Sequence, residues 1–515
     1  MYMPRYAAID IGSNSIRMMA AEVSHGETSI LAQDRQVIRL GESVFRTGQV
    51  SAEALTVMQS TLERMSAAYK AFSVVGMRAV ATSAVRDAGN QHEFLSSANA
   101  ALGTNVEIIS GPEEARLIHL GVEARWPRGK ERTLIIDVGG GSAELIICQN
   151  GQLIDAVSRP LGAVRLNEVF LKSDPPSAEE RRRLDSYIEE KLQPFLKLHD
   201  AEKFDRIIAT SATAAAIVCA VNQITRARRD DAERMRASTS QVRDLYQTLI
   251  SSNLEARRKL TGIGPRRAEI VTAGTAVFLK VLELFNQRSI SYCGAGVRDG
   301  IVADLAARGV GRELAQLTRE RRAIVDAMAK RYEVSMKHVR HVAFLAHRLF
   351  DTLQPVHRLP PDAGKLLEAA SILHDIGHFV SATGHHKHSA YLVANSDMPG
   401  FTDRERLIIA ALVRFHRKSM PQARHSHFLA LDLEARRWVT TLAAILRIAD
   451  SLDRGHSQKV RDVTSTLRDG TVCLSIDAET DADLELWAAS EAAKIFSELH
   501  AQPLQLQRSK AATHQ

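Results

Sequence analysis

A short segment that occurs twice limits the possible folds of this chain more than any other feature. Ile9–Ser15 has the sequence IDIGSNS, and Ile136–Ser142 has the sequence IDVGGGS. In each copy an apolar strand ends in aspartate, a turn rich in Gly and Ser follows, and a second apolar strand begins. Because internal repeats set the architecture of a chain, we predict two similar α/β halves that face each other.

Strands and helices alternate around both copies as far as about residue 308. A Ser cap at residue 51 begins a predicted helix over 51–71. The Trp-Pro-Arg-Gly segment at 126–129 indicates a break, so we place the halves at residues 1–128 and 129–311. Short apolar segments predict strands at 6–11, 16–23, 29–39, 74–81, 106–110, 133–137, 206–210 and 290–293.

Beyond residue 312 the pattern becomes helix after helix with many histidines. We predict an all-α domain over 312–455 and a small α/β segment over 456–515. In that last segment, strand-like stretches at 459–467 and 471–477 flank Arg468-Asp469-Gly470, a predicted hairpin turn. A final helix is predicted over 485–500, followed by a short tail from Pro503.

Charge and cysteine content restrict the classes of partner and compartment. Among 515 residues, 67 Lys and Arg stand against 60 Asp and Glu, which gives a net charge of +7. This mild excess favours a polyanionic or phosphorylated partner without requiring nucleic acid. The four cysteines are far apart, and no apolar run approaches the roughly 18 residues of a membrane helix. We therefore expect a cytoplasmic protein with reduced thiols and no membrane contact.

The two repeated turns are suited to binding phosphate. A turn rich in Gly and Ser directs several backbone N–H groups at one anion. Asp10 and Asp137 cannot bind phosphate themselves, but they can hold Mg²⁺ or a metal-bound water, and Glu144 can join Asp137. The predicted phosphate-binding residues are Ser13, Asn14, Ser15, Gly139, Gly140, Gly141 and Ser142.

A third motif, Ser110–Leu117, contains two glutamates at the start of a predicted helix. Acidic residues at a helix N-terminus stabilise the macrodipole, which is one interpretation of Glu113 and Glu114. Glutamates in that turn can equally face a cleft and orient an attacking water. The residues alone leave both interpretations open.

Together, Asp10–Ser15, Ser110–Arg116 and Asp137–Glu144 resemble the exopolyphosphatase and guanosine pentaphosphate phosphohydrolase (Ppx/GppA) family. The resemblance covers about residues 4–310. It implies a duplicated actin-like fold of the ASKHA superfamily with two ribonuclease-H-like halves. It also implies that Glu114 is the general base, that Asp137 and Glu144 bind Mg²⁺ with Asp10 nearby, and that Arg86 joins the phosphate-binding residues.

The chain departs from the family pattern at two positions. Ala212 stands where Gly is usual, so the loop around it is left outside the predicted site. Glu269 stands where Asp is common, which weakens any role for Arg267. Five further arginines have acidic neighbours and are first interpreted as a solvated surface. They would explain the basic charge only if they line the cleft: Arg226, Arg228, Arg229, Arg234 and Arg236.

The histidine-rich region contains His338, the pair His374-Asp375 and Asp450 in that order. This set resembles the HD phosphohydrolase domain, whose helices bring His and Asp together on a divalent metal. The resemblance implies a second metal site for a transition metal such as Mn, Fe, Zn or Ni. A degenerate domain used for binding and homodimer formation is the alternative. Four histidines are candidate ligands for a further metal: His385, His386, His388 and His416.

Several functions fit these motifs. The first hypothesis is an exopolyphosphatase that removes terminal phosphate from inorganic polyphosphate by Mg²⁺-assisted attack of water. The alternative within the same chemistry is a pppGpp 5′-phosphohydrolase that gives ppGpp. More distant alternatives are a nucleotide-dependent kinase or ATPase, and a sensor attached to an active HD domain.

Overall fold

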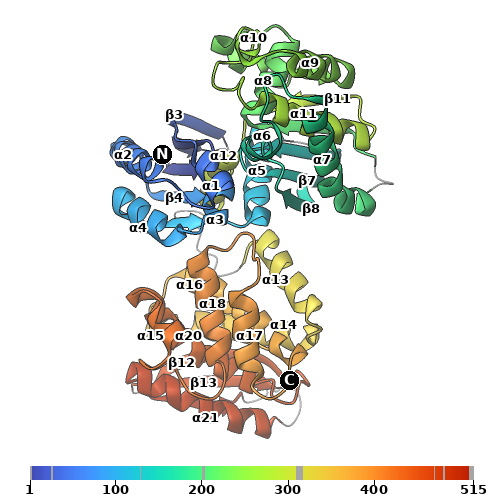
Figure 1. The fold of residues 1–515 in the computed structure, drawn as a ribbon. Helices are drawn as coiled ribbons and strands as arrows, with labels where there is room; N and C mark the ends of the chain where they lie inside the picture. The colour runs from blue at the N-terminus through green and yellow to red at the C-terminus, as the bar shows by residue number, and fades with distance from the viewer. Residues whose placement is uncertain are drawn as a thin grey trace. The chain divides into compact units, whose positions relative to one another are not determined.

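The chain folds into two compact units, residues 1–311 and 312–515, shown in the computed structural model of Figure 1. The structure describes residues 3–24, 27–127, 129–199, 203–308, 317–468, 470–478 and 482–509. The predicted boundaries at 128 and at 311–312 lie outside the described residues, as does Asp469 of the predicted hairpin turn. Among the described residues, no helix is both long and apolar enough to cross a membrane.

Unit 1 contains two sheets with a repeated topology. The first has the order β3-β2-β1-β4-β5: Glu27–Val37, Ser15–Ser24, Arg5–Ile11, Gly76–Ala81 and Val106–Ile108. The second has the order β10-β11-β9-β6-β7-β8: Arg236–Ser238, Ser289–Tyr292, Arg206–Thr210, Arg132–Val138, Ala143–Gln149 and Gln152–Arg159. In both, an antiparallel hairpin continues into parallel strands, β1 beside β4 and β6 beside β9. The order β8-β7-β6-β9-β11 therefore matches β3-β2-β1-β4-β5, which confirms the predicted duplication.

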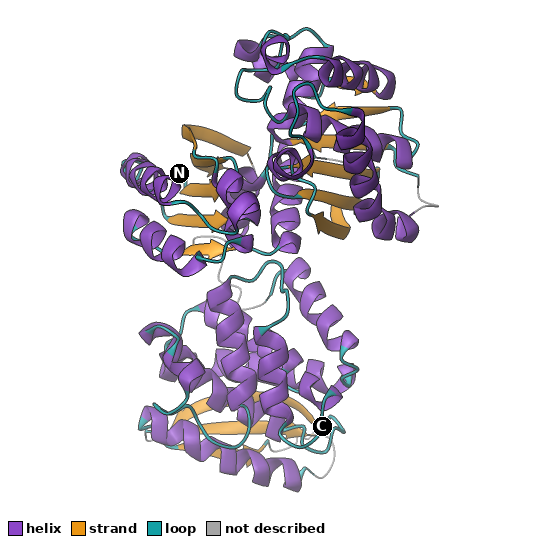
Figure 2. Ribbon diagram, in the orientation of Figure 1, coloured by secondary structure: helices purple, strands orange, loops and turns teal. Residues whose placement is uncertain are grey.

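The central strands are apolar on both sides because helices cover both faces of the sheets (Figure 2). In β1, Ala7 and Ile9 pack with α2, whereas Tyr6 and Ala8 pack with α12. The helices of unit 1 are α1 (Leu40–Thr47), α2 (Ala52–Lys70), α3 (Ser83–Asp87), α4 (Gln91–Leu102), α5 (Gly111–Arg125), α6 (Ala163–Phe170), α7 (Ala178–His199), α8 (Ser211–Val221), η1 (Arg226–Ala232), α9 (Thr239–Ser251), α10 (Leu254–Arg258), α11 (Val271–Leu284) and α12 (Val297–Arg308).

Helix α5 belongs to the hydrophobic cores of both halves. Its Leu117 packs with the first sheet and α12, whereas Ala115, Ile118 and Val122 pack with β6 and β7 of the second sheet. The Ser110 side chain caps its N-terminus by accepting from Glu113 N. The start of α5 is thereby fixed between the two halves.

A buried ion network fastens α5 to α12. Glu113 accepts from Arg78 at 2.9 Å and from Arg116 at 2.8 Å, and Asp304 accepts from Arg116 at 3.0 Å and from Arg308 at 2.8 Å. Burial alone would raise the pKa of Asp304, but the three arginines outweigh burial and lower that pKa to about 2.

We expect Asp304→Asn to reduce the free energy of unfolding of unit 1 by about 3–5 kcal/mol, because it leaves buried arginines without a counter-charge. The contribution is complete above the ordinary carboxyl pKa of about 4 and is lost as the pH falls toward 2. Urea unfolding at pH 7 and at pH 3 should show the gap between wild type and variant shrinking in acid. Asp244→Asn, at an exposed position of α9, is the matched control; an equal effect there would contradict the network's role.

The C-terminal unit combines helices with a three-stranded sheet of order β12-β13-β14 (Figure 2). The strands are Val460–Arg468, Thr471–Ala478 and Leu504–Arg508. The predicted hairpin of β12 and β13 is confirmed as an antiparallel pair. The predicted short tail is wrong, because β14 pairs in parallel with β13 and directs Leu504 and Leu506 toward the core.

The helices of this unit are α13 (Arg319–Arg331), α14 (Met336–Thr352), α15 (Gln354–His357), α16 (Pro361–Leu373), η2 (Ile376–Phe379), α17 (His385–Ala394), α18 (Asp403–Phe415), α19 (Ser426–Leu429), α20 (Leu433–Ser451) and α21 (Asp483–His500). The helices and the sheet share one hydrophobic core, in which Leu345 and Leu446 belong to the same cluster as Val463 and Phe496. The segments predicted at 312–455 and 456–515 therefore have no separate cores.

Candidate functional site

The two repeated hairpins have equivalent geometry. In the first, Asp10 lies opposite Arg17, and the Gly12 N–H donates to Ser15 O at 3.1 Å. In the second, Asp137 lies opposite Glu144, and the Gly139 N–H donates to Ser142 O at 3.0 Å. The same turn therefore ends both hairpins.

Both turns line one cavity of roughly 110 Å³ in unit 1. All the predicted residues of this site line it except Arg86 and Glu144. The Arg86 guanidinium donates to Ile109 O at 2.5 Å. Glu144 is buried, and its carboxylate accepts from Ser158 Oγ at 2.7 Å. These two side chains therefore do not line this cavity.

The glycines of the second turn are required by close packing against the first turn. A Cβ added to Gly140 would lie 2.9 Å from Ser13 Cβ, and one added to Gly141 would lie 2.7 Å from Ser13 Oγ. The buried Ser13 hydroxyl lines the cavity without a hydrogen-bond partner among the described residues. Together these features form a cradle that exposes backbone N–H groups and an unsatisfied hydroxyl to an anion.

The carboxylates of Asp10 and Asp137 line this cradle, and Glu144 lies opposite Asp137 on the neighbouring strand. Burial raises the pKa of Asp10, Asp137 and Glu144, and Asp137 adds to the effect at Glu144, whose pKa rises to about 7. The Asp137 carboxylate accepts from Thr210 Oγ1 at 2.5 Å. Among the described residues, these three carboxylates do not form a group with all ligand atoms within 4.8 Å. In this geometry, therefore, the three carboxylates cannot all coordinate the same ion directly.

The structure separates the roles of the two adjacent glutamates. Glu113 belongs to the buried ion network, whereas Glu114 lines the cavity. Glu114 is 8% exposed, and its Oε2 has no hydrogen-bond partner among the described residues and lies 3.6 Å from Arg86 Nη2. Burial, then Glu144, raises the pKa of Glu114 well above its ordinary value. A carboxylate with a free oxygen facing a phosphate cradle can accept a proton from water.

Sequence reasoning left out the loop that begins α8. Ser211 and Ala212 line the cavity, and Ser211 has a left-handed backbone with φ of 81°. The Ala212 methyl group does not close the cavity. Arg165 was also missed: its Nε donates to Gly141 O at 2.7 Å, and its guanidinium pairs with Asp87. The Leu-Gly-Ala-Val-Arg-Leu segment at 161–166 was the available signal.

A second cavity of roughly 320 Å³ adjoins the first. Asn14, Ala212, Arg229 and Arg267 line both. Seven arginines line one or both cavities, and we call them the arginine cluster: Arg17, Arg35, Arg226, Arg229, Arg266, Arg267 and Arg298.

The arginine cluster concentrates positive charge, and none of its members forms an ion pair within 4.0 Å with a described carboxylate, although Asp10 and Asp299 interact electrostatically with Arg298. Burial and then Arg17 lower the pKa values of Arg267 and Arg298, and the same causes lower the pKa of Arg35 to about 10. Glu269 does not neutralise Arg267 but pairs with Arg39 at 3.0 Å. A bound polyanion would relieve this mutual repulsion.

The arginines predicted as a solvated surface divide into two groups. Arg226 and Arg229 line the cavities. Arg228 is exposed and pairs with Asp231 at 2.7 Å, Arg234 lies over the Trp126 ring, and Arg236 is exposed. The basic charge of this region therefore serves the cavities only in part.

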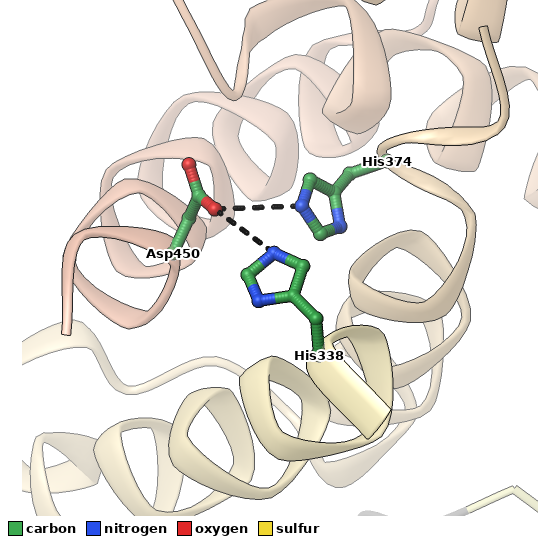
Figure 3. A group of neighbouring side chains, drawn as sticks. All are labelled: His338, His374 and Asp450. Atoms are coloured by element: carbon green, nitrogen blue, oxygen red, sulfur yellow. Dashed lines mark ion pairs between the residues drawn. The ribbon is translucent and has the colours of Figure 1, made fainter. Parts of the chain in front are cut away.

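The C-terminal unit contains a separate cluster of His and Asp. His338 on α14, His374 at the end of α16 and Asp450 on α20 point toward one another (Figure 3). Asp450 Oδ1 lies 3.4 Å from His374 Nε2 and 3.7 Å from His338 Nε2. Among the described residues, the groups of three potential ligands within 4.8 Å all lie in this unit. They are His338-His374-Asp450, His338-Asp375-His456 and Asp375-His385-His416.

A duplicated α/β fold with a phosphate cradle and a buried glutamate defines a class of enzyme, the phosphoanhydride hydrolases with an actin-like fold. Residues 19–308 match the Ppx/GppA phosphatase family, and residues 320–490 match Ppx/GppA phosphatase, domain III. The chain therefore belongs to the Ppx/GppA phosphatase family, which confirms the resemblance.

Relatives of nearly equal length are similar to the chain along most of their sequences. A Vibrio vulnificus protein named guanosine-5′-triphosphate,3′-diphosphate pyrophosphatase is 28% identical over 494 residues, 94% of this chain and 96% of its own length. An Aliivibrio fischeri protein with the same name is 28% identical over 493 residues, 94% of this chain and 95% of its own length.

Solved structures are similar to a smaller part of the chain. The Aquifex aeolicus member of the family has a TM-score of 0.53 at 27% identity, and the match covers 60% of this chain and 99% of that one. An exopolyphosphatase-like protein has a TM-score of 0.56 at 29% identity with the same coverage. Members of this family are phosphoanhydride hydrolases that generally use a divalent metal.

Proposed function

We propose that the chain removes the 5′-terminal phosphate of pppGpp to give ppGpp and inorganic phosphate. The similarity to guanosine-5′-triphosphate,3′-diphosphate pyrophosphatases over 94% of the chain carries this proposal. It favours the alternative named from the sequence over the first hypothesis, an exopolyphosphatase.

The two adjoining cavities suit a substrate with two anionic groups. The cradle would hold the terminal phosphates of the 5′ chain through Ser13, Asn14, Ser15, Gly139–Gly141 and Ser142. The arginine cluster would then neutralise the 3′-diphosphate. The second cavity also has small and apolar wall residues beside its arginines, which suit the uncharged part of a nucleotide: Val37, Ala215, Ala216 and Cys219.

In the proposed reaction, Glu114 Oε2 accepts a proton from water as the water oxygen bonds to the terminal phosphorus. The phosphoanhydride P–O bond breaks, and the shortened chain leaves with the electron pair. Arg86, 3.6 Å from Glu114, would orient that carboxylate rather than hold phosphate. The cradle would hold the phosphate in line with the attacking water.

A divalent cation fits the carboxylates beside the cradle. Asp10, Asp137 and Glu144 are buried, and burial is the first cause of their raised pKa values, so a bound cation would favour their charged forms. Because their oxygens are not gathered into one group of three, we propose that Mg²⁺ binds through one or two of them and through water. When bound, Mg²⁺ supplies charge neutralisation for the phosphates.

A comparison of substrates tests the proposal. We expect kcat/KM for pppGpp to exceed that for long polyphosphate by about tenfold or more, which corresponds to about 1.4 kcal/mol of transition-state binding. Phosphate release with Mg²⁺ under identical conditions measures both values. A higher value for polyphosphate would favour the exopolyphosphatase, and tight ATP binding without phosphate release from either substrate would favour a kinase or ATPase.

For the C-terminal unit we propose an HD-like domain with a metal site at His338, His374, Asp375 and Asp450. The convergence of these side chains supports this proposal. A homodimer formed through this unit remains a prediction, which sedimentation velocity can test.

A further inference from the structure

The His and Asp side chains of the C-terminal unit form two groups that meet at Asp375. We propose that this unit holds two divalent transition-metal ions side by side, with the Asp375 carboxylate bridging them. His338, His374 and Asp450 would complete the first position, and His385 and His416 the second. This inference concerns the C-terminal unit alone and does not depend on the proposed function of unit 1.

The two oxygens of Asp375 face different groups. Oδ2 lies 3.6 Å from His374 Nε2 and 3.9 Å from His338 Nε2. Oδ1 lies 3.5 Å from His385 Nε2, and His385 Nε2 lies 3.3 Å from His416 Nε2. A carboxylate placed in this way can give one oxygen to each of two ions.

The rings of these histidines are held so that Nε2 points to the centre. His338 Nδ1 contacts Asp453 Oδ2 at 2.8 Å, and the other three Nδ1 atoms contact backbone carbonyls. Those carbonyls are Ser371 O for His374 at 2.7 Å, Val413 O for His416 at 2.7 Å and Ala382 O for His385 at 3.3 Å. Metal-bound histidines commonly have such partners, which fix the tautomer and leave Nε2 to the ion.

These contacts leave two hydrogen-bond acceptors, the Nε2 atoms of His385 and His416, facing each other without a donor between them. A backbone carbonyl can only accept, so the Nδ1 atoms of His385 and His416 must donate. In the neutral rings both Nε2 atoms then carry lone pairs, and they face each other at 3.3 Å. His338 Nε2 and His374 Nε2 are buried without hydrogen-bond partners among the described residues. Cations between these atoms and the carboxylates would satisfy all four.

The spacing suits first-row transition metals. Two ligands about 2.1 Å from one ion, at angles of 90–110°, lie about 3.0–3.4 Å apart. The contacts across each group are 3.3–3.9 Å, so a small contraction would complete each shell. Nitrogen-rich sets with carboxylates favour Mn, Fe, Co, Ni or Zn over Mg.

The structure also selects among the histidines considered from the sequence. His385 and His416 join the centre, whereas the His386 ring lies 6.4 Å from the His416 ring, and His388 belongs to none of the candidate groups among the described residues. His456 stacks on His338 at 3.6 Å and is exposed, and His378 is half-exposed at 3.5 Å from Asp375 Oδ1. These two rings mark the side of the centre that reaches solvent.

Manganese binding to the metal-stripped full-length chain tests the inference. We expect two Mn²⁺ ions to bind in the C-terminal unit and to give an exchange-coupled electron paramagnetic resonance signal, because ions that share a bridging carboxylate in two-metal sites lie about 3.5–4 Å apart. Asp375→Asn should abolish the coupling. His416→Ala should leave a single uncoupled ion, and elemental analysis should show the loss of one Mn²⁺ per chain.

Two control variants make the result specific. His388→Ala should keep the coupled signal, and Glu144→Gln should keep it even where phosphate release is lost. A folded wild-type chain that is saturated with Mn²⁺ and gives no exchange-coupled signal would overturn the proposal whatever the variants do. A coupled signal that survives Asp375→Asn would overturn the bridging role.

Discussion

Glu114→Gln should lower kcat for phosphate release from pppGpp by about 10²–10⁴-fold, the usual contribution of a general base. The amide cannot accept a proton, although it has nearly the same shape and keeps the packing of the start of α5. The proposed binding groups are the cradle and the arginine cluster, which this change leaves intact. Substrate affinity, measured by calorimetry, should therefore stay within about threefold of wild type, which is below 1 kcal/mol.

Glu63→Gln is the matched control, because Glu63 is an exposed glutamate on α2 in the same half. It should retain wild-type kinetics. Near-normal turnover in Glu114→Gln would exclude Glu114 as the base. A loss of affinity as large as the loss of kcat would indicate that Glu114 holds the substrate or its metal.

Arg267→Ala should raise KM for pppGpp by about 10–100-fold, because a charged hydrogen bond contributes about 1.5–3 kcal/mol. Arg267 lines both cavities, and it lies among the like charges of Arg17, Arg35 and Arg229. It makes no ion pair with a described carboxylate. We therefore expect only a modest change in kcat, since the proposed role of Arg267 is to bind the charge of the substrate and not to act on the attacking water.

Arg228→Ala is the matched control for charge. Arg228 lies on η1 between the cavity-lining Arg226 and Arg229, but it pairs with Asp231 in solvent. Its removal should leave KM unchanged. The KM of the wild-type chain should also rise with salt more steeply than that of Arg267→Ala. If both substitutions raise KM equally, the arginine cluster attracts anions only through its overall charge and does not bind the substrate specifically.

The hairpins and the duplication were predictable because they are local. Each turn depends on residues that are adjacent in sequence. The repeat of the motif at 136–142 showed that the segment at 9–15 is a motif as well. The residues alone did not decide between Glu113 and Glu114, and only the family resemblance favoured Glu114. Adjacent residues on a helix point about 100° apart, and packing decides which one faces the cavity. Here the arginines at 78 and 116 hold Glu113 away from it.

The arginine cluster was hidden because its members come from distant parts of unit 1. Arg17 and Arg35 are on β2 and β3, Arg229 is on η1 and Arg298 is on α12. No single segment shows a basic motif, and Arg228 beside them faces solvent. The His and Asp group of the C-terminal unit could be predicted, in contrast, because His338, His374-Asp375 and Asp450 follow one another in the order of a known motif. The sequence did not show which of the α17 histidines, His385, His386 or His388, faces the other ligands.

Helix α5 has a consequence for how this enzyme can move. Its side chains are embedded in the cores of both halves, and Glu114 lies at its first turn. If a rotation separates the two hairpin turns, α5 must move with one half or the other. The Glu114 carboxylate then moves away from at least one of the turns. In the proposed reaction, a rotation that opens the two halves to release product would therefore also displace Glu114, the proposed base. If the halves open in this way, hydrolysis would follow only after the two turns have closed around the phosphate.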